Sequence, residues 1–194
     1  ICFGGPEIAP KPGYWRYDST TAHFLECPKS SACLYFDFEF YASDATENLQ
    51  FFPDIVLKPK TAEEVSQIVK HCNAELLPIT PRGAGTGLAG GALPVKGGVL
   101  LSLERMNQIL EIDTKNFQTT VEAGVINYNL QQALFQHNLF FPPDPSSWQS
   151  SFIGGNIATN AGGPKAVKYG VTANYVLNLE VVLPNGEIIW TGAN

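Results

Sequence analysis

The sequence has 194 residues, 44% of them hydrophobic and 15% charged, which is the composition of a folded globular protein rather than a disordered one. Eighteen acidic residues against twelve basic ones give a net charge of −6. This balance argues against nucleic acid or an anionic membrane as the main partner, because both require concentrated positive charge. No apolar run approaches the roughly 20 residues that a membrane-spanning helix needs.

The first 40 residues differ from the rest of the chain. They show neither helical nor strand periodicity, they are rich in proline, and they hold Cys2, Cys27 and Cys33. Such a cysteine cluster suggests part of a disulfide or metal framework, although the spacing matches no zinc signature. We therefore divide the chain into two parts. Residues 1–40 are a Cys- and Pro-containing segment, which is either of unknown role or a fused foreign piece, and residues 41–194 are the main domain.

The main domain begins with an alternation of strands and helices. Residues 54–60 are typical of a strand, and a helix is expected to begin at Thr61, which forms a capping box with Glu64. The helix has one apolar stripe at the spacing i, i+3, i+4 and i+7. Its members are Val65, Ile68, Val69 and Cys72. We expect Cys72 to be a small buried hydrophobic residue.

The middle of the domain continues in the same way. Strands are expected at residues 75–80 and 97–103, and a pair of strands within residues 108–124 is joined by a turn at residues 114–116. A second helix is predicted near Asn127. Its apolar stripe is Leu130, Ala133, Leu134 and His137.

Residues 139–170 form a long segment rich in proline and glycine that is expected to be only briefly helical. The chain then closes with a hairpin over residues 176–192, turned by Asn185 and Gly186, which is the strongest hairpin signal in the sequence. The pattern predicts an α+β or α/β domain with two long irregular loops. Long loops inside a compact domain are usually functional.

The first of these loops is the run PRGAGTGLAGG at residues 81–91, whose glycines Gly85, Gly87 and Gly90 spell GxGxxG. A dinucleotide-binding Rossmann loop requires a helix that starts at the glycines, and no helix fits before the next strand. A P-loop is excluded as well, because the chain contains no Gly-Lys-Ser/Thr.

We interpret this loop as an anion-binding nest, because glycines allow consecutive backbone N–H groups to turn inward. Arg82 either holds a phosphate or shapes the loop through its fork of donors, and Thr86 adds a hydroxyl. The alternative is a flexible connector with a solvated Arg82.

The second loop, IGGNIATNAGG at residues 153–163, has a similar composition. Its glycines allow a ligand to lie against the backbone, and Asn156, Thr159 and Asn160 supply directional hydrogen bonds. Upstream, the prolines of PPDPSSW stiffen a turn. Asp144 in this turn either caps a neighbouring element or accepts a hydrogen bond from a ligand hydroxyl.

These motifs, together with VEAGV and VLNLEVVLPNGE, resemble the FAD-linked oxidases of the PCMH-type or vanillyl-alcohol-oxidase superfamily. Within it they are most similar to the branch that contains the glycolate oxidase D subunit and the D-lactate and D-2-hydroxyglutarate dehydrogenases. The resemblance covers most of residues 50–190 in the family's order. It implies an α+β fold in which two α/β subdomains hold FAD between them, incomplete here at the C-terminus.

The resemblance also implies where the cofactor lies. The FAD pyrophosphate is expected on the first loop, and the ribityl and flavin parts pass the Pro-rich turn and the second loop. Some relatives bind flavin covalently through a histidine in the first loop, where this sequence has Thr86, so noncovalent FAD is expected. The implied cofactor-binding residues are Arg82, Gly83, Ala84, Gly85, Thr86, Gly87, Pro143, Asp144, Pro145, Ser147, Gly154, Gly155, Asn156, Thr159, Asn160 and Gly162.

The implied reaction is hydride transfer from a D-2-hydroxy acid such as glycolate, D-lactate or D-2-hydroxyglutarate to flavin N5, with an unassigned electron acceptor. The substrate-binding cap, and the metal ligands of many members, are expected beyond the end of this sequence. We assign no catalytic residue and no metal site, since His23, His71 and His137 do not form a ligand set; His71 and His137 are expected to be structural. A cytoplasmic or mitochondrial location is expected for the FAD domain.

Two alternatives stay open from the sequence. In the first, the chain is a catalytically inactive FAD module, either truncated or fused to a Cys-rich interaction segment. In the second, it is similar to the enolpyruvoyl-sugar reductases, which share the fold and use NADPH.

Overall fold

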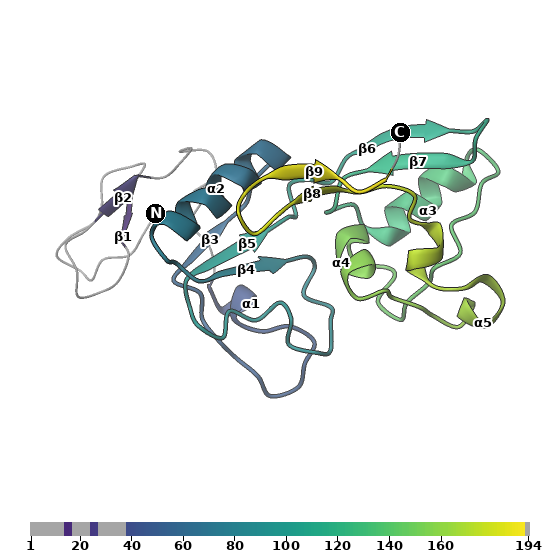
Figure 1. Ribbon diagram of the computed structural model, residues 1–194. Coiled ribbons are helices and arrows are strands. Elements are labelled where there is room, and N and C mark those ends of the chain that lie inside the picture. Colours follow the sequence, from purple (N-terminus) through teal and green to yellow (C-terminus); the bar gives the residue numbers. More distant parts are fainter. Residues whose placement is uncertain (1–13, 17–23, 27–37, 193–194) are drawn as a thin grey trace.

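The computed structural model describes residues 14–16, 24–26 and 38–192. The predictions for Cys2, Cys27, Cys33 and His23 concern positions outside this part. Strands β1 (Tyr14–Arg16) and β2 (Phe24–Glu26) pair antiparallel. The elements that follow form two lobes, which lie side by side in Figure 1.

The first lobe is built on a parallel sheet of β3 (Ile55–Leu57), β5 (Val99–Ser102) and β4 (Ile79–Arg82), in that order across the sheet. Alternate residues of its strands point to opposite faces. One face, with Ile55, Leu57, Val99 and Leu101, packs on α2 (Ala62–Ala74), and the other, with Val56 and Leu100, packs on α1 (Phe38–Ala42). Because both faces are covered, every residue of β5 is buried.

Helix α2 confirms the sequence expectation in detail. The Thr61 hydroxyl accepts a hydrogen bond from the Glu64 N–H at 3.2 Å, and the Glu64 carboxylate accepts from the Lys60 N–H at 2.8 Å. The predicted stripe faces the sheet, and Cys72 is 2% exposed. Burial raises the pKa of the Cys72 thiol to about 11, so it remains protonated and unreactive at neutral pH.

The second lobe contains the antiparallel pair β6 (Ile109–Asp113) and β7 (Gln118–Val121), with helix α3 (Asn127–Phe135) packed beside it. Short helices follow: α4 (Ile153–Ala158), α5 (Ala166–Tyr169) and the 3₁₀ turn η1 (Thr172–Tyr175). The core of this lobe consists of Val125, Leu130, Leu134 and Ile153.

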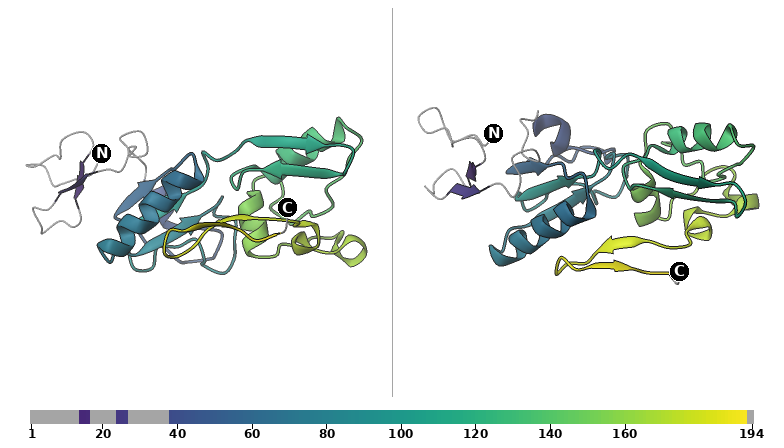
Figure 2. Two further views of the ribbon diagram at one scale, coloured as in Figure 1. Left: turned by 45° about the horizontal axis from the view of Figure 1, so that its top comes forward. Right: turned by 90° about the horizontal axis from the view of Figure 1, so that it is seen from above.

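The closing hairpin, β8 (Glu180–Val182) with β9 (Ile188–Trp190), returns from the second lobe to the first and runs alongside α2 (Figure 2). Its turn is fastened to the helix, because Ser66 donates a hydrogen bond to the Gly186 carbonyl and Asn73 donates to the carbonyl of Pro184. The hairpin therefore links the two lobes.

Several local expectations are wrong. His137 is exposed and lies beyond α3, because the helix ends in a turn in which the N–H groups of residues 137 and 139 both reach the Leu134 carbonyl. The strand predicted at residues 75–80 begins only at Ile79, since Leu76 has a positive φ of 54° in the turn that ends α2. The division of the chain after residue 40 stays a prediction; α1 spans this position.

A polar network at the carboxyl edge of the sheet connects α1, β3 and β5. The Glu104 carboxylate accepts hydrogen bonds from Tyr41 Oη at 2.9 Å and Ser102 Oγ at 3.0 Å, and it pairs with Lys58. Burial alone would raise the pKa of Glu104, but the bonds from Lys58, Tyr41 and Ser102 outweigh burial and hold it below its ordinary value. Burial and the neighbouring carboxylate raise the pKa of Tyr41.

We predict a pH-dependent loss of stability on replacing Glu104 by Gln. A carboxylate whose pKa is lower in the folded state stabilises the fold above its ordinary pKa, and this contribution is lost as the pH falls through the folded pKa. The variant removes the carboxylate that pairs with the nearly buried Lys58 ammonium, which should lower the free energy of unfolding by roughly 2 kcal/mol at neutral pH.

Thermal unfolding at pH 7 and at about pH 3.5 measures this effect, which should shrink at the lower pH. The exposed Glu75, replaced by Gln, is the control and should change little at either pH. An equal loss at both pH values for the Glu104 variant would contradict the prediction.

Candidate functional site

The first glycine loop leaves the sheet at the carboxyl end of β4, the edge at which open parallel sheets bind their ligands. Residues 83–98 contain no helix, as predicted. Residues 83–86 are half-buried, yet within the described part of the chain the backbone N–H groups of residues 83–87 donate no hydrogen bond. A run of such unpaired donors is a site for an anion.

The segment that follows α1 holds this loop in place. The Ala45 N–H donates to the Gly85 carbonyl at 3.0 Å, and the Gly90 N–H donates to the Thr46 hydroxyl at 2.9 Å. These two hydrogen bonds use the carbonyl of Gly85 and the N–H of Gly90, which lies near the end of the loop. They leave the N–H groups of residues 83–87 for another partner.

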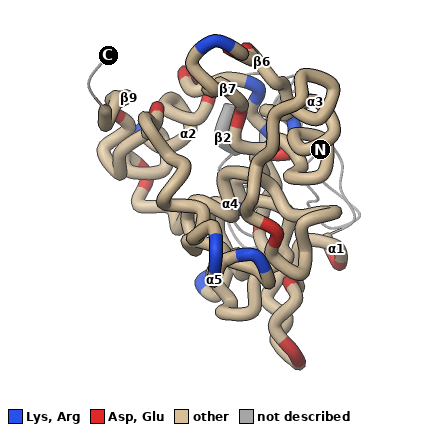
Figure 3. Tube along the Cα trace, turned by 90° about the vertical axis from the view of Figure 1, so that its right-hand side faces the viewer, with Lys and Arg blue, Asp and Glu red and all other residues tan. Residues whose placement is uncertain are grey.

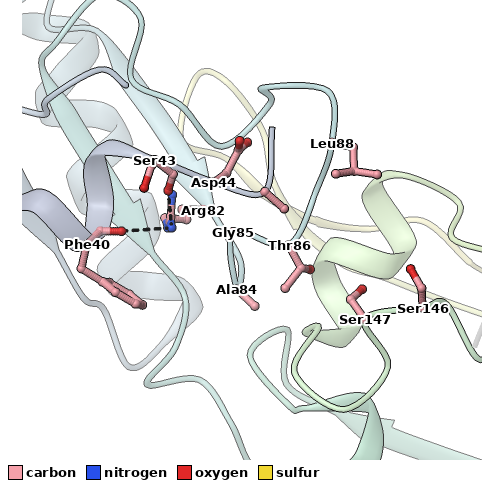
Figure 4. A pocket seen from close by; sticks show the side chains of 11 residues that line it. Phe40, Ser43, Asp44, Arg82, Ala84, Gly85, Thr86, Leu88, Ser146 and Ser147 are labelled. Carbon is pink, nitrogen blue, oxygen red and sulfur yellow. Dashed lines mark hydrogen bonds between the residues drawn. The ribbon is translucent and has the colours of Figure 1, made fainter. Parts of the chain in front are cut away.

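Arg82 lies beneath the loop and is only 4% exposed. Its Nη2 donates to the Ser43 carbonyl at 2.9 Å and to the Phe40 carbonyl at 3.4 Å (Figure 4). The guanidinium also lies 5.9 Å from the ring centroid of Phe40 and 5.6 Å from that of Tyr41. The alternative of a flexible connector with a solvated Arg82 is therefore wrong.

A pocket of about 530 Å³ opens beside the loop. It brings Thr86 of the first loop together with Ser146 and Ser147 of the Pro-rich turn, which comes from the other lobe (Figure 4). The two motifs that the sequence analysis treated separately thus meet at one place. The full lining is Phe40, Ser43, Asp44, Ala45, Arg82, Ala84, Gly85, Thr86, Leu88, Ser146 and Ser147.

The Pro-rich turn is fixed from below by α3. The Pro143 carbonyl accepts hydrogen bonds from Asn127 Nδ2 and from Gln131 Nε2, each at 3.2 Å. Asp144 makes contacts of the kind expected for a structural role: its carboxylate pairs with the Lys165 ammonium at 3.1 Å and accepts from the Lys165 N–H at 3.3 Å. Lys165 directly precedes α5, and the blue segments that mark Lys and Arg in Figure 3 lie at this helix.

The second glycine segment differs from the expected loop, because Gly154 and Gly155 belong to helix α4. The helix is set against the residues before α3: the Gly154 N–H donates to the Ala123 carbonyl at 2.8 Å, and a Cβ on Gly154 would lie 2.8 Å from the Ala123 Cβ. A Cβ on Gly83 would lie 3.7 Å from the Gly155 Cα. The two glycine segments therefore touch across the lobe boundary.

The polar residues of the second segment divide into two groups. Thr159 donates to the Gly155 carbonyl at 3.0 Å, and the Asn160 carboxamide accepts from the Ala173 N–H at 2.9 Å, so both serve the local structure. Asn156 is 4% exposed, and its Nδ2 has no hydrogen-bond partner among residues 38–192. Gly162, in the same segment, is also closely surrounded, because a Cβ on it would lie 3.1 Å from Val171 Cγ1.

The glycines also divide by what surrounds them. A Cβ on Gly85, which has a φ of +70°, would lie 2.2 Å from Arg82 Nη2, so glycine is required there by the protein itself. A Cβ on Gly163 would lie 2.0 Å from the Asp144 carbonyl oxygen. In contrast, a Cβ on Gly87 or on Gly155 would meet no atom of the described residues within 4 Å.

The sequence analysis missed part of the pocket: Phe40, Ser43, Asp44 and Ala45, which precede the first recognisable motif, and Leu88 and Ser146. No local pattern marks the first four, because the bonds that bring them to the loop join residues about 40 positions apart. Within the described ranges no group of three His, Cys, Asp or Glu residues is suited to a metal ion, and no helix there is long and apolar enough to cross a membrane.

Comparison with known proteins identifies the family of this site. The sequence profile described as "FAD binding domain" matches residues 53–192. The chain belongs to this family of FAD-binding domains. It is 51% identical over 152 residues to the glycolate oxidase subunit GlcD of Bacillus subtilis (strain 168), a match that covers 78% of this chain and 32% of that protein.

A second relative is the D-lactate dehydrogenase of Archaeoglobus fulgidus, with 49% identity over 186 residues, 96% of this chain and 37% of the relative. The chain thus spans about a third of the length of these curated relatives. The fold is shared with alkyldihydroxyacetonephosphate synthase, at a TM-score of 0.67 and 26% identity over 75% of this chain and 29% of the other.

It is also shared with the 6-hydroxy-D-nicotine oxidase of Arthrobacter nicotinovorans, at a TM-score of 0.66 and 23% identity over 80% of this chain and 33% of the other. These likenesses confirm the expected PCMH-type FAD-binding fold.

We predict that replacing Gly87 by Ala weakens FAD binding without weakening the fold. The added methyl group meets no atom within 4 Å in the described part of the chain, so the free energy of unfolding should change by no more than about 0.5 kcal/mol. The same methyl group lies on the loop whose N–H groups are proposed to bind the cofactor. Because it occupies space at this loop, it should lower the affinity for FAD by about ten-fold.

Gly91, replaced by Ala, is the matched control, because its Cβ position is equally open but lies outside residues 83–87. Calorimetric titration with FAD and a thermal melt of each variant give the two readouts. Wild-type affinity in the Gly87 variant would show that the cofactor does not approach the loop at this residue.

Proposed function

We propose that this chain is the FAD-binding part of a flavin-dependent oxidoreductase that oxidises a D-2-hydroxy acid. The observation that carries the proposal is the row of unpaired backbone N–H groups at residues 83–87, placed beside a pocket at the carboxyl edge of a parallel sheet. Relatives named as a glycolate oxidase subunit and as a D-lactate dehydrogenase supply the substrate class.

The residues present suit FAD. A pyrophosphate needs several donors and nearby positive charge. Residues 83–87 offer N–H groups, and the buried Arg82 adds a positive charge beneath them, which faces the field of the Asp44 carboxylate in the same pocket. We propose that Ser147 with the Pro143–Pro145 turn, and then Gly154, Gly155 and Asn156, line the path toward the flavin. The open space above Gly155 and the unpaired Nδ2 of Asn156 support this assignment.

We propose that Thr159, Asn160, Gly162 and Asp144 contribute by shaping this path, since their polar atoms and close contacts are used within the protein. The cofactor is held without a covalent bond in this proposal, because Thr86 offers no ring nitrogen for attachment. When bound, FAD supplies the redox chemistry by accepting a hydride at N5 of its flavin. The protein groups here bind it and orient it.

Binding of FAD is tested by incubating the 194-residue chain with FAD, removing free cofactor by gel filtration, and recording the visible spectrum. Flavin absorbance that co-elutes with the protein, together with calorimetric binding, is the expected result. Riboflavin, which lacks the pyrophosphate, is the matched control ligand and should bind at least about ten-fold more weakly. Absence of any bound flavin would refute the proposal.

The reaction is tested separately by mixing the loaded protein, in the absence of oxygen, with glycolate, D-lactate or D-2-hydroxyglutarate; an artificial electron-accepting dye is added afterwards to follow turnover. Bleaching of the flavin by one of these acids, and none by L-lactate, is expected for the D-2-hydroxy-acid oxidoreductase. Bound flavin that none of them reduces would favour the alternative of a catalytically inactive FAD module. Bleaching by NADPH would favour the enolpyruvoyl-sugar reductase alternative.

A further inference from the structure

We infer that Arg82 is a positioning residue, which holds the backbone of residues 83–87 in its anion-binding shape from beneath and does not itself contact the phosphate. The inference rests on the proposed function, and it chooses between the two roles that the sequence left open for this side chain. Three features support this role: the environment of the guanidinium, its contact with Gly85, and the charged groups around it.

The first observation is that Nη2 of Arg82 is directed at the protein, while Nη1 is buried without a hydrogen-bond partner among the described residues. Nη2 is shared between the carbonyls of Phe40 and Ser43, at 3.4 and 2.9 Å, and the side chain is 96% buried, given its 4% exposure. Figure 4 shows the guanidinium between these carbonyls and the loop. A guanidinium presents its donors in a rigid planar fork, which a lysine ammonium cannot reproduce.

The second observation is the contact between Arg82 and Gly85. A Cβ on Gly85 would lie 2.2 Å from Nη2 and 2.7 Å from Cζ of Arg82, so the guanidinium fills the space directly under this glycine. The Gly85 carbonyl meanwhile accepts from the Ala45 N–H at 3.0 Å. Residue 85 is therefore fixed by the side chain of Arg82 and by the backbone of the segment that Arg82 also binds.

The third observation concerns charge. Asp44, Tyr41 and Glu104 are the acidic groups whose fields act on Arg82, and burial lowers the pKa of Arg82, although an arginine stays protonated in a protein. The positive charge thus lies under the loop. It favours an anion above the N–H groups without touching it.

The test compares Arg82→Lys with Arg82→Met in calorimetric titrations with FAD at several salt concentrations. Because neither side chain fills the space under Gly85 with a planar group, both variants should lose at least about ten-fold in affinity. Arg82→Met, which also removes the positive charge, should lose more than Arg82→Lys, and Arg82→Lys should keep the wild-type dependence of the affinity on salt. Full affinity in the Lys variant would show that a positive charge at this position is sufficient, and it would overturn the inference.

A second test needs no FAD. Gly85→Ala should destabilise the apo chain strongly in the presence of Arg82, because the methyl group overlaps the guanidinium, and much less in an Arg82→Ala background, where only the cost of the positive φ remains. Gly90→Ala is the matched control: Gly90 has a similar φ of +67°, but its Cβ would lie 3.6 Å from Leu93, not against Arg82. Its effect should add to that of Arg82→Ala.

The two tests separate this inference from the proposed function. If the wild-type chain binds no FAD, the proposed function fails, while thermal unfolding of the four Arg82 and Gly85 combinations still reports their coupling. If FAD binds and the Gly85 and Arg82 effects are additive, the positioning role is overturned and the proposed function stands.

Discussion

A guanidinium removed from water must find hydrogen-bond acceptors inside the protein, and this requirement organises the candidate site. The acceptors for Arg82 Nη2 are the carbonyls of Phe40 and Ser43 at the end of α1, and Phe40 lies 42 residues earlier in the sequence. These hydrogen bonds tie α1 to the end of β4. The loop that follows β4 rests on the same guanidinium through Gly85. The shape of the anion site therefore depends on a segment that carries no recognisable motif of its own.

The glycines of the site perform two distinct physical tasks. At Gly85, Gly154 and Gly163 a side chain would collide with the protein, so glycine lets Arg82, Ala123 and Asp144 come close to the backbone. At Gly87 and Gly155 a Cβ would meet no atom within 4 Å among the residues that the structure describes, so glycine there leaves bare backbone at the surface of the site. The first kind allows the two lobes to assemble around the site, and the second leaves room for a ligand.

Much of the fold follows from local patterns. The apolar stripe of α2, the buried strand β5 and the hairpin turn at Asn185–Gly186 are where the sequence places them, since their signals lie within a few residues. Helix α4 escaped detection because its glycines have low helix propensity, and tertiary bonds such as that from Ile153 N–H to the Val125 carbonyl hold the helix instead. His137 was misplaced because helix periodicity does not show where a helix ends.

The sequence alone was sufficient to determine the family, the FAD cofactor and the loops expected to carry it, because these depend on short motifs in a specific order. Only the tertiary structure decided that Thr86 faces Ser147 across one pocket, that Asp144 is engaged by Lys165, and that Arg82 points beneath its loop. The physical reason is that a side chain takes its role from the partners that reach it. For Arg82 those partners are carbonyl groups about 40 residues away, which no local pattern announces.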